Sequence, residues 1–418
     1  MTPTLYRQAL EHGIGSPHQM ASRKIALERF FARGLPTPRD EDWKYTALDF
    51  LERAELHAPQ HAAEDWASED YPGVVLKFGN GRLTDLHSKS VHAHSLSERA
   101  DTSLVVRHLG QLADTFPGGA ALADINSALW KDGLLLHVPV GWKASPLFVA
   151  HMASEADAML HLRHLVVLEA GTEAVLVEHD QGTPELPYWH NTVTEILLGE
   201  GARLTHIKLD EDSAAATHTS LTLVEQSRDS RYQALSINVG GRVARHDTWV
   251  NLAGNGAECR LDGLFIADAR RHIDQHLHIE HAASHTTSRQ TWRGVAAGRG
   301  RGIFDARVVV QAGAQKADAQ QSSRNLLLSP YAEIDVKPQL EIYTDDVKCG
   351  HGATVGQLDE AQVFYLRSRG IDADAAHALL LRGFAEAALE LLERSGLTAW
   401  LEPHLLAALP VVRKEHTA

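Results

Sequence analysis

The feature that most constrains the fold is a long series of short apolar runs that begins after Asp132. Runs such as LLLHVPV, AVLVEHD and IFDARVVV have the length of strands, recur about every 10 to 20 residues, and are separated by Gly, Asn, Asp or Ser. Roughly two hundred residues of strands with hardly a helix between them exclude a doubly wound α/β sheet. A sandwich, a barrel or a solenoid remains, and the regular pitch, the length and the scarcity of short Asn-Gly turns favour a solenoid. In a solenoid, inward residues such as Val308 and Val310 stack into ladders.

The segments on either side of these runs show helical spacing. We expect a mostly helical region over 1–130, with SRKIALERFFARG and LVVRHLGQLADTF as helices, then a β core over 131–356 and a helical region over 357–418. The stretch PTPRDEDWKYTAL is interpreted as a helix entry that packs Trp43 and Tyr45 into the core.

Two helices are predicted near the C-terminal end of the sequence. Asp359 caps the first, which stops at Gly370, and Asp372 caps the second, which stops at Gly396. The apolar face of the second helix is wider than one neighbour needs to bury. Two interpretations stay open, a docking surface for a partner and a cap that packs back on the end of the solenoid. The apolar positions are Ala375, Leu379, Leu380, Leu381, Phe384, Leu389 and Leu391.

Charge and cysteine content limit the partners and the compartment. Forty basic and 54 acidic side chains give a net charge of -14, which disfavours nucleic acid. The two cysteines, Cys259 and Cys349, cannot form a disulfide framework, and the first residues resemble neither a signal peptide nor a transit peptide. No apolar run is long enough to cross a bilayer. We therefore expect a cytoplasmic chain with free thiols and no membrane partner.

The 26 histidines are densest over residues 272–285, HIDQHLHIEHAASH. On a strand, His272, Asp274, His276, His278 and Glu280 share one face, because side chains alternate with a period of two. His276 and His278 therefore offer an alternative function, a metal-dependent β-fold oxygenase, whereas the commoner explanation is a solvated outer row.

Motifs for nucleotide and hydrolytic chemistry are missing from the sequence. GRGRG and GHGATVG lack the Walker spacing and its Lys-Ser/Thr, so we expect this chain to bind no ATP itself. There is no Gly-x-Ser-x-Gly elbow, and the acidic neighbours Asp345 and Asp346 point to opposite faces of an extended chain.

Cys349 and His351 form a Cys-x-His pair in the glycine-rich stretch KCGHGATVG. On an extended segment both side chains point the same way, so the thiol and the imidazole can address one ion. A stable zinc or iron-sulfur site needs about four ligands, and Cys259 lies far upstream. Other residues of this chain or a second chain must supply the rest, unless Cys349 is a buried, inert thiol.

The stretch DDVKCGHGATVGQLDEAQVFYLRSRGI resembles the C-terminal signature of the SufD branch of the SufB/SufD family. The similarity continues upstream through QTWRGVAAGRGRGIFDARVVVQ and includes EDWKYT, so that it covers most of the chain. It implies a right-handed parallel β-helix that acts as a non-catalytic scaffold of the SUF iron-sulfur assembly system and supports iron acquisition. The implied partners are a SufB-like sister scaffold and two copies of a SufC-like ABC-type ATPase.

The resemblance also assigns roles to residues of this sequence. Cys349 and His351 match the family positions at the SufB interface, where a nascent cluster or iron would be held with ligands from SufB. His351 is then either a ligand or the group that lowers the pKa of the thiol. Gly350 departs from the Ser that the family often has there.

The C-terminal helices of the family dock the ATPase. The corresponding partner-facing residues are Asp372, Leu379, Leu380, Phe384 and Leu389. A homodimer in the absence of partners, a reduced flavin in the complex and the cluster type are left open, as is a purely structural adapter in which Cys349 is inert.

Overall fold

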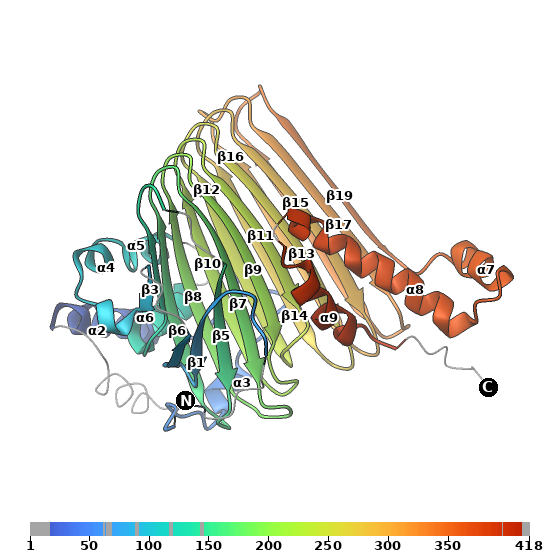
Figure 1. Cartoon of the computed structure of the whole chain (residues 1–418), viewed down its shortest axis with the longest axis horizontal. Coiled ribbons are helices and arrows are strands. Elements are labelled where there is room, and N and C mark those ends of the chain that lie inside the picture. Colours follow the sequence, from blue (N-terminus) through green and yellow to red (C-terminus); the bar gives the residue numbers. More distant parts are fainter. Residues whose placement is uncertain are drawn as a thin grey trace.

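The computed structural model describes residues 17–61, 63, 69–87, 92–116, 120–142, 146–394 and 396–411. Residues 1–16, where the N-terminal region was predicted to begin, lie outside the described residues. Two β-sheets dominate, and the chain alternates between them (Figure 1). Odd-numbered strands from β5 to β19 belong to the ten-stranded sheet and even-numbered strands from β4 to β18 to the nine-stranded sheet, with parallel pairing throughout. This arrangement is a parallel β-helix, and it confirms the predicted solenoid.

The strand bounds are β1 (Val74–Gly79), β2 (Arg82–His87), β3 (Ala93–Ser95), β4 (Leu134–Val138), β5 (Leu147–Ala153), β6 (Met159–Leu168), β7 (Glu173–Gly182), β8 (Trp189–Leu198), β9 (Arg203–Glu211), β10 (Thr217–Gln226), β11 (Arg231–Asn238), β12 (Val243–Leu252), β13 (Glu258–Ala267), β14 (His272–His281), β15 (Thr287–Ala296), β16 (Arg301–Val310), β17 (Asp318–Leu327), β18 (Glu333–Ile342) and β19 (Lys348–Gly356). The helix bounds are α2 (Pro17–Arg33), η1 (Glu41–Trp43), α3 (Phe50–Arg53), η2 (Ser97–Arg99), α4 (Ser103–His108), α5 (Gln111–Thr115), α6 (Ala120–Leu129), α7 (Glu360–Ser368), α8 (Ala373–Glu386), η3 (Ala387–Arg394) and α9 (Thr398–Ala408).

Pairing is position for position along the solenoid, as in the register of β10 with β12 from Thr217 opposite Val243 to Gln226 opposite Leu252. Inward side chains therefore form columns, and the predicted inward residues Val308 and Val310 are fully buried. Because each residue stacks on its equivalent one turn later, the core forms without strict sequence repeats.

One corner of the solenoid places a residue in the left-handed region at turn after turn. Gly171, Gly201 and Gly256 have φ values of 68°, 65° and 73°, and Asp229 and His285 take the same region at equivalent corners. Glycine adopts this conformation without steric cost, so it accounts for part of the spacing seen in the sequence. His285, the last member of the dense histidine segment, is thus a corner residue.

The N-terminal region contains strands that the sequence analysis did not expect. Strand β1 pairs with β5 and forms an antiparallel hairpin with β2, while β3 pairs with β4. These strands extend both sheets, and α2 and α6 pack nearby with their own apolar cluster. The runs that form them are short and lack the regular pitch of the later strands, so helical spacing dominated the prediction.

The stretch EDWKYT attaches the N-terminal region to the outer face of the nine-stranded sheet. The Trp43 ring is buried beneath the Arg245 guanidinium at 3.7 Å, and the hydroxyl of Thr46 contacts both Asp274 and His272. Burial of Trp43 is confirmed, whereas Tyr45 is only half-buried.

The predicted C-terminal caps are confirmed. The Asp359 carboxylate accepts a hydrogen bond from the Ala361 amide, and Asp372 accepts one from the Ala375 amide. The single long helix predicted from Asp372 to Gly396 is wrong, since α8 ends at Glu386 and continues as η3. Helix α9 follows Gly396, and this C-terminal segment lies along the outer face of the ten-stranded sheet (Figure 1). No helix in the described ranges is both long and apolar enough to cross a membrane.

Candidate functional site

Cys349 and His351 lie on β19, the last strand of the ten-stranded sheet. Their pairing partners on β17 are Ala319 and Gln321, whose side chains are buried inside the solenoid. The thiol and the imidazole therefore share the inward-facing side of β19, as the two-residue spacing predicted.

This end of the solenoid is open. Among the described strands, β19 pairs only with β17, and β18 pairs only with β16. Most of β19 is consequently exposed, including His351, while Cys349 is half-buried against the core. Pro338 in β18 has no amide hydrogen to donate, which suits an edge position. Unpaired edges of this kind are sites at which another chain can dock.

The thiol at this end is not activated by its own chain. Burial raises the pKa of Cys349, and the nearby Asp318 carboxylate adds to the effect. The predicted lowering of its pKa would therefore have to come from a bound metal or from another chain. Cys259 belongs to the same inward column, with Ser288 and Ala319 between the two cysteines. Three strand spacings put them about 14 Å apart, too far for one ion.

The histidine row of β14 faces outward, a question that the sequence left open, and its side chains are buried or half-buried and not solvated. Ile273, Leu277 and Ile279 point into the core, so His276 and His278 lie on the opposite face. His276 Nε2 is 2.8 Å from Asp274 Oδ1, and the His278 ring meets the Trp249 ring edge-on. Within the described residues, neither histidine belongs to a group of three metal-competent side chains. The geometry therefore gives no support to the oxygenase alternative.

The predicted partner-facing residues have different environments. Asp372 is the exposed cap of α8, Leu379 is 49% exposed, and Leu380 is half-buried. Phe384 packs against the guanidinium of Arg293, and Leu389 is buried against the ten-stranded sheet by its own chain. Leu389 is therefore unsuited to a partner surface. Part of the predicted wide apolar face packs on the ten-stranded sheet of the same chain.

Helices α7 and α8 extend away from the sheets (Figure 1). Side chains of both helices line an apolar groove. Phe364 and Tyr365, which the sequence analysis did not select, are 73% and 56% exposed beside it. The residues that line the groove are Ala361, Gln362, Tyr365, Leu366, Leu379 and Leu380.

A protein-family model described as SUF system FeS cluster assembly, SufBD core domain, matches residues 151–384. This chain belongs to the SufBD family. It is 31% identical to the iron-sulfur cluster assembly protein SufD of Escherichia coli over 89% of this chain and 88% of that protein. A SufBD family protein of Synechocystis is 30% identical over 91% of this chain and 89% of its own length. The SufD of Bacillus subtilis is 29% identical over 63% of this chain and 61% of that protein.

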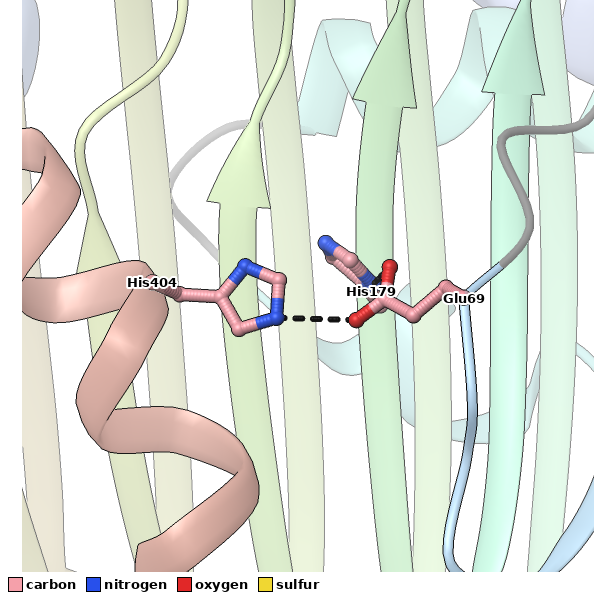
Figure 2. Close-up of side chains that lie close together, drawn as sticks. All are labelled: Glu69, His179 and His404. Carbon is pink, nitrogen blue, oxygen red and sulfur yellow. Dashed lines mark ion pairs between the residues drawn. The ribbon is translucent and has the colours of Figure 1, made fainter.

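The SufBD solenoid also contains two groups of interacting titratable side chains that sequence reasoning missed. The first, here called the outer cluster, lies where α9 meets the ten-stranded sheet and consists of Glu69, His179, Glu211 and His404. Figure 2 shows His404 of α9 directed at the Glu69 carboxylate, with His179 beside it. Glu211 Oε2 is 2.8 Å from His179 Nε2 and 2.9 Å from His404 Nδ1.

Electrostatics show that the outer cluster is an ion-pair network. Burial alone would lower the pKa of His404, but its contacts with Glu211 and Glu69 raise it to about 9. Burial would likewise raise the pKa of Glu211, and hydrogen bonds from His179 and His404 hold it at about 2. Ion pairs in the outer cluster thus connect the segment before β1, the strands β7 and β9, and helix α9 of this SufBD chain.

The second group, here called the inner cluster, is fully buried in the solenoid interior and consists of His190, Asp210, Asp212, His218 and His246. The imidazoles and carboxylates of these residues approach one another to within 2.9–3.2 Å. A sequence signal existed in the run LTHIKLDED, where His206, Lys208 and Asp210 alternate with apolar residues, whereas His218 lies in the unbroken polar run THTS. Alternation alone does not say which of the two faces is the inside.

Proposed function

We propose that this chain is the non-catalytic scaffold subunit of a SUF iron-sulfur cluster assembly complex, paired with a SufB-like chain at its open end. The observation that carries the proposal is the position of Cys349 and His351, two inward-facing ligands on a strand that has no further neighbour in the described chain. In the described residues they belong to no group of three metal-competent side chains. A second solenoid docked against β18 and β19 would bring the ligands that complete the site.

The cluster, with its iron, is the cargo of this site and not a resident cofactor. Cys349 would bind iron as thiolate after the metal displaces its proton, since burial raises the pKa of the free thiol. His351, exposed at the same edge, would supply a nitrogen ligand from the neighbouring inward position. The glycines Gly350 and Gly352 on either side of His351 leave the backbone accessible to a partner strand.

The groove between α7 and α8 supports a second contact, with an ABC-type ATPase. Tyr365 and Leu379 line the groove, and Phe364 is a further exposed ring on α7. All three lie beyond the part of α8 that packs on the sheet. Such a patch on a protruding helix pair is typical of a protein interface. ATP-driven closure of two ATPase subunits would pull on α8, and through it on the solenoid, to open the cluster site to iron and sulfide.

Anaerobic affinity purification of the tagged chain from its own cell extract tests the proposal. We expect a second SufBD chain and an ABC-type ATPase to co-purify in fixed proportion. A Cys349→Ala/His351→Ala variant should keep both partners and lose cluster formation. Isolation of the wild-type chain without either partner would refute the proposal, and normal cluster formation by the variant would refute the ligand role.

A further inference from the structure

The interior of the solenoid is polar on one side over several consecutive turns. Between β5 and β12, inward positions at one end of each strand carry His, Asp, Glu, Lys, Ser or Thr, while the other end carries Leu, Val and Ile. These polar side chains are buried: His151, His164, Glu178, Asp180, His190, Thr192, Thr194, His206, Asp210, Asp212, His218, Ser220, Thr222 and His246. Such burial is costly unless each group finds compensation.

The inner cluster has the spacing of a coordination site. His218 Nδ1 lies 3.2 Å from Asp210 Oδ2 and 2.9 Å from Asp212 Oδ2. His190 Nδ1 is 3.1 Å from the same oxygen of Asp212, and His246 Nε2 is 3.0 Å from the same oxygen of Asp210. Ligands bound at about 2.1 Å around one transition-metal ion are separated by roughly 3.0–3.4 Å. The five side chains thus form two triads of this spacing that share His218, one with His190 and Asp212 and the other with Asp210 and His246.

Within the inner cluster, His218 is the side chain whose burial is least compensated by hydrogen bonds. It is fully buried, and neither ring nitrogen has a hydrogen-bond partner of good geometry among the described residues. Its Nδ1 can donate only one proton, although two carboxylate oxygens face it. An ion bound by His190, Asp212 and His218 would satisfy His218 Nδ1 and leave Asp210 to His246.

The second polar atoms of three of these side chains also have hydrogen-bond partners. His190 Nε2 is 3.0 Å from the hydroxyl of Thr192, and His246 Nδ1 is 2.7 Å from the hydroxyl of Ser220. Tyr188 donates its hydroxyl proton to Asp212 Oδ1 at 2.5 Å. Metal-binding histidines and carboxylates are commonly oriented by such partners on their second atom, which fixes the ring and the free lone pair.

Charge favours a cation here. Among inward-facing described residues of β5 to β12, Lys208 is the one Lys or Arg, and its ammonium is 3.8 Å from Glu178. Asp180 is paired with His151 at 2.6 Å, and the ion pairs of Asp210 and Asp212 within the described chain are all with imidazoles. Two carboxylates, neutral imidazoles and one divalent ion sum to zero charge, the state that a water-poor interior favours.

We propose that the inner cluster is a binding site for one divalent first-row transition ion, of the type that nitrogen and oxygen ligands hold, such as iron(II), cobalt(II) or zinc(II). His190, Asp212 and His218 supply its ligands, and the second triad, Asp210 and His246 with the shared His218, flanks it. Mg²⁺ and Ca²⁺ fit less well, because they prefer ligand sets made of oxygen alone. The site is separate from the open end, about five strand spacings or roughly 24 Å away, and does not rest on the proposed cluster function.

The full chain, produced in medium with added cobalt(II) and washed with chelator, provides the test. Loading during synthesis lets the ion enter before the interior closes. We expect about one ion per chain by elemental analysis, together with a visible ligand-field band and without the near-ultraviolet band that a thiolate ligand gives. A wild-type chain that emerges free of cobalt, or whose cobalt shows a thiolate band, would overturn the proposal.

Matched variants separate this site from others. Asp212→Asn/His218→Gln should lose the ion, whereas Glu178→Gln/His206→Gln, an equally buried pair in contact at 2.9 Å, should keep it. Cys349→Ala/His351→Ala should also keep it, so failure of the cluster proposal would not be confused with failure of this one. If the first variant does not fold by circular dichroism, His190→Gln replaces it, with an expected loss of at least tenfold in affinity. Cobalt retained at wild-type level in the folded variants would contradict the proposal.

Discussion

His404 Nε2 of α9 lies 2.8 Å from Glu69 Oε1, so the last helix of the described chain is held by a segment that precedes the first strand. Glu211 at the end of β9 contacts the other nitrogen of the same imidazole. One side chain thereby fixes α9 to two separate parts of the solenoid. Helix α8 and η3, which precede α9, have apolar contacts of their own with the same sheet.

Replacement of His404 by Gln should loosen α9. Two half-buried carboxylates would lose their cationic partner, and we expect a loss of about 1–3 kcal/mol in the local stability of α9. Hydrogen exchange of α9 peptides measures this directly. The control is His137→Gln, which removes a surface partner of Glu169 at the same 2.9 Å spacing and should change stability by less than about 0.5 kcal/mol. Equal protection of α9 in wild type and His404→Gln would contradict the prediction.

The same contact should weaken in alkali. The ordinary pKa of histidine is about 6.5, and contacts with Glu211 and Glu69 raise that of His404 to about 9. The stabilising contribution is therefore complete below about pH 6.5 and is lost as the pH rises through about 9. Glu69, Glu211 and His179 face this imidazole, and Trp400 lies beside it. Exchange of α9 corrected for its intrinsic pH dependence should accelerate over this range, and His404→Gln should abolish the transition. A wild-type profile that is flat from pH 6.5 to 10 would exclude His404 as the titrating group.

Trp43 should be the strongest single attachment of the N-terminal region. Trp43→Ala removes a buried ring beneath Arg245, and we expect a cost of about 3–5 kcal/mol in the free energy of unfolding. Trp142→Ala, at a ring that is 47% exposed, is the matched control and should cost far less. Denaturant titration of both variants checks this. Similar midpoints for the two would mean that Trp43 does not hold the region in place.

A charge in the groove between α7 and α8 should block binding of the proposed ATPase partner without unfolding the chain. Leu379→Asp is expected to weaken binding of the ATPase at least tenfold, because an apolar interface side chain becomes charged. Val106→Asp places the same charge at a similarly exposed site on α4 and should leave binding unchanged. Both variants should melt near the wild-type temperature. Wild-type affinity of Leu379→Asp would remove this groove from the proposed interface.

The two cysteines should differ sharply in reactivity. Burial raises the pKa of both thiols, but Cys259 is fully enclosed whereas Cys349 is only half-buried at the open end. Iodoacetamide should therefore modify Cys349 in the native chain, more slowly than a free thiol, and reach Cys259 only after denaturation. Mass spectrometry of the labelled peptides identifies the site. Docking of a SufBD partner should protect Cys349, and labelling of Cys349 at an unchanged rate in the complex would place the interface elsewhere.

The solenoid and the helix caps could be predicted from the sequence because they depend on local signals. Strand-length runs at a regular pitch and the Asp-cap positions 359 and 372 are each visible within a few residues. The common orientation of Cys349 and His351 followed from the period of two along a strand. Strands β1 to β3 lacked a regular pitch, and the end of α8 at Glu386 depends on how η3 packs on the sheet.

The buried clusters could not be predicted, because a period of two along a strand does not show which of its two faces points into the core. His179 and Asp180 are neighbours in the chain, yet His179 faces α9 while Asp180 faces the interior. A row of polar residues is usually assigned to the solvent side, and here that assumption fails over several turns. Only the register of successive turns shows that His190 and His218 lie next to each other.

The open end formed by β18 and β19 also has a consequence for protein supply. A chain released without a partner exposes a strand edge that can pair with any other exposed strand, including that of an identical copy. Surplus subunits would therefore cap one another or aggregate. For the proposed pair of scaffold chains, balanced synthesis would then be a requirement set by backbone hydrogen bonds, independent of any metal chemistry.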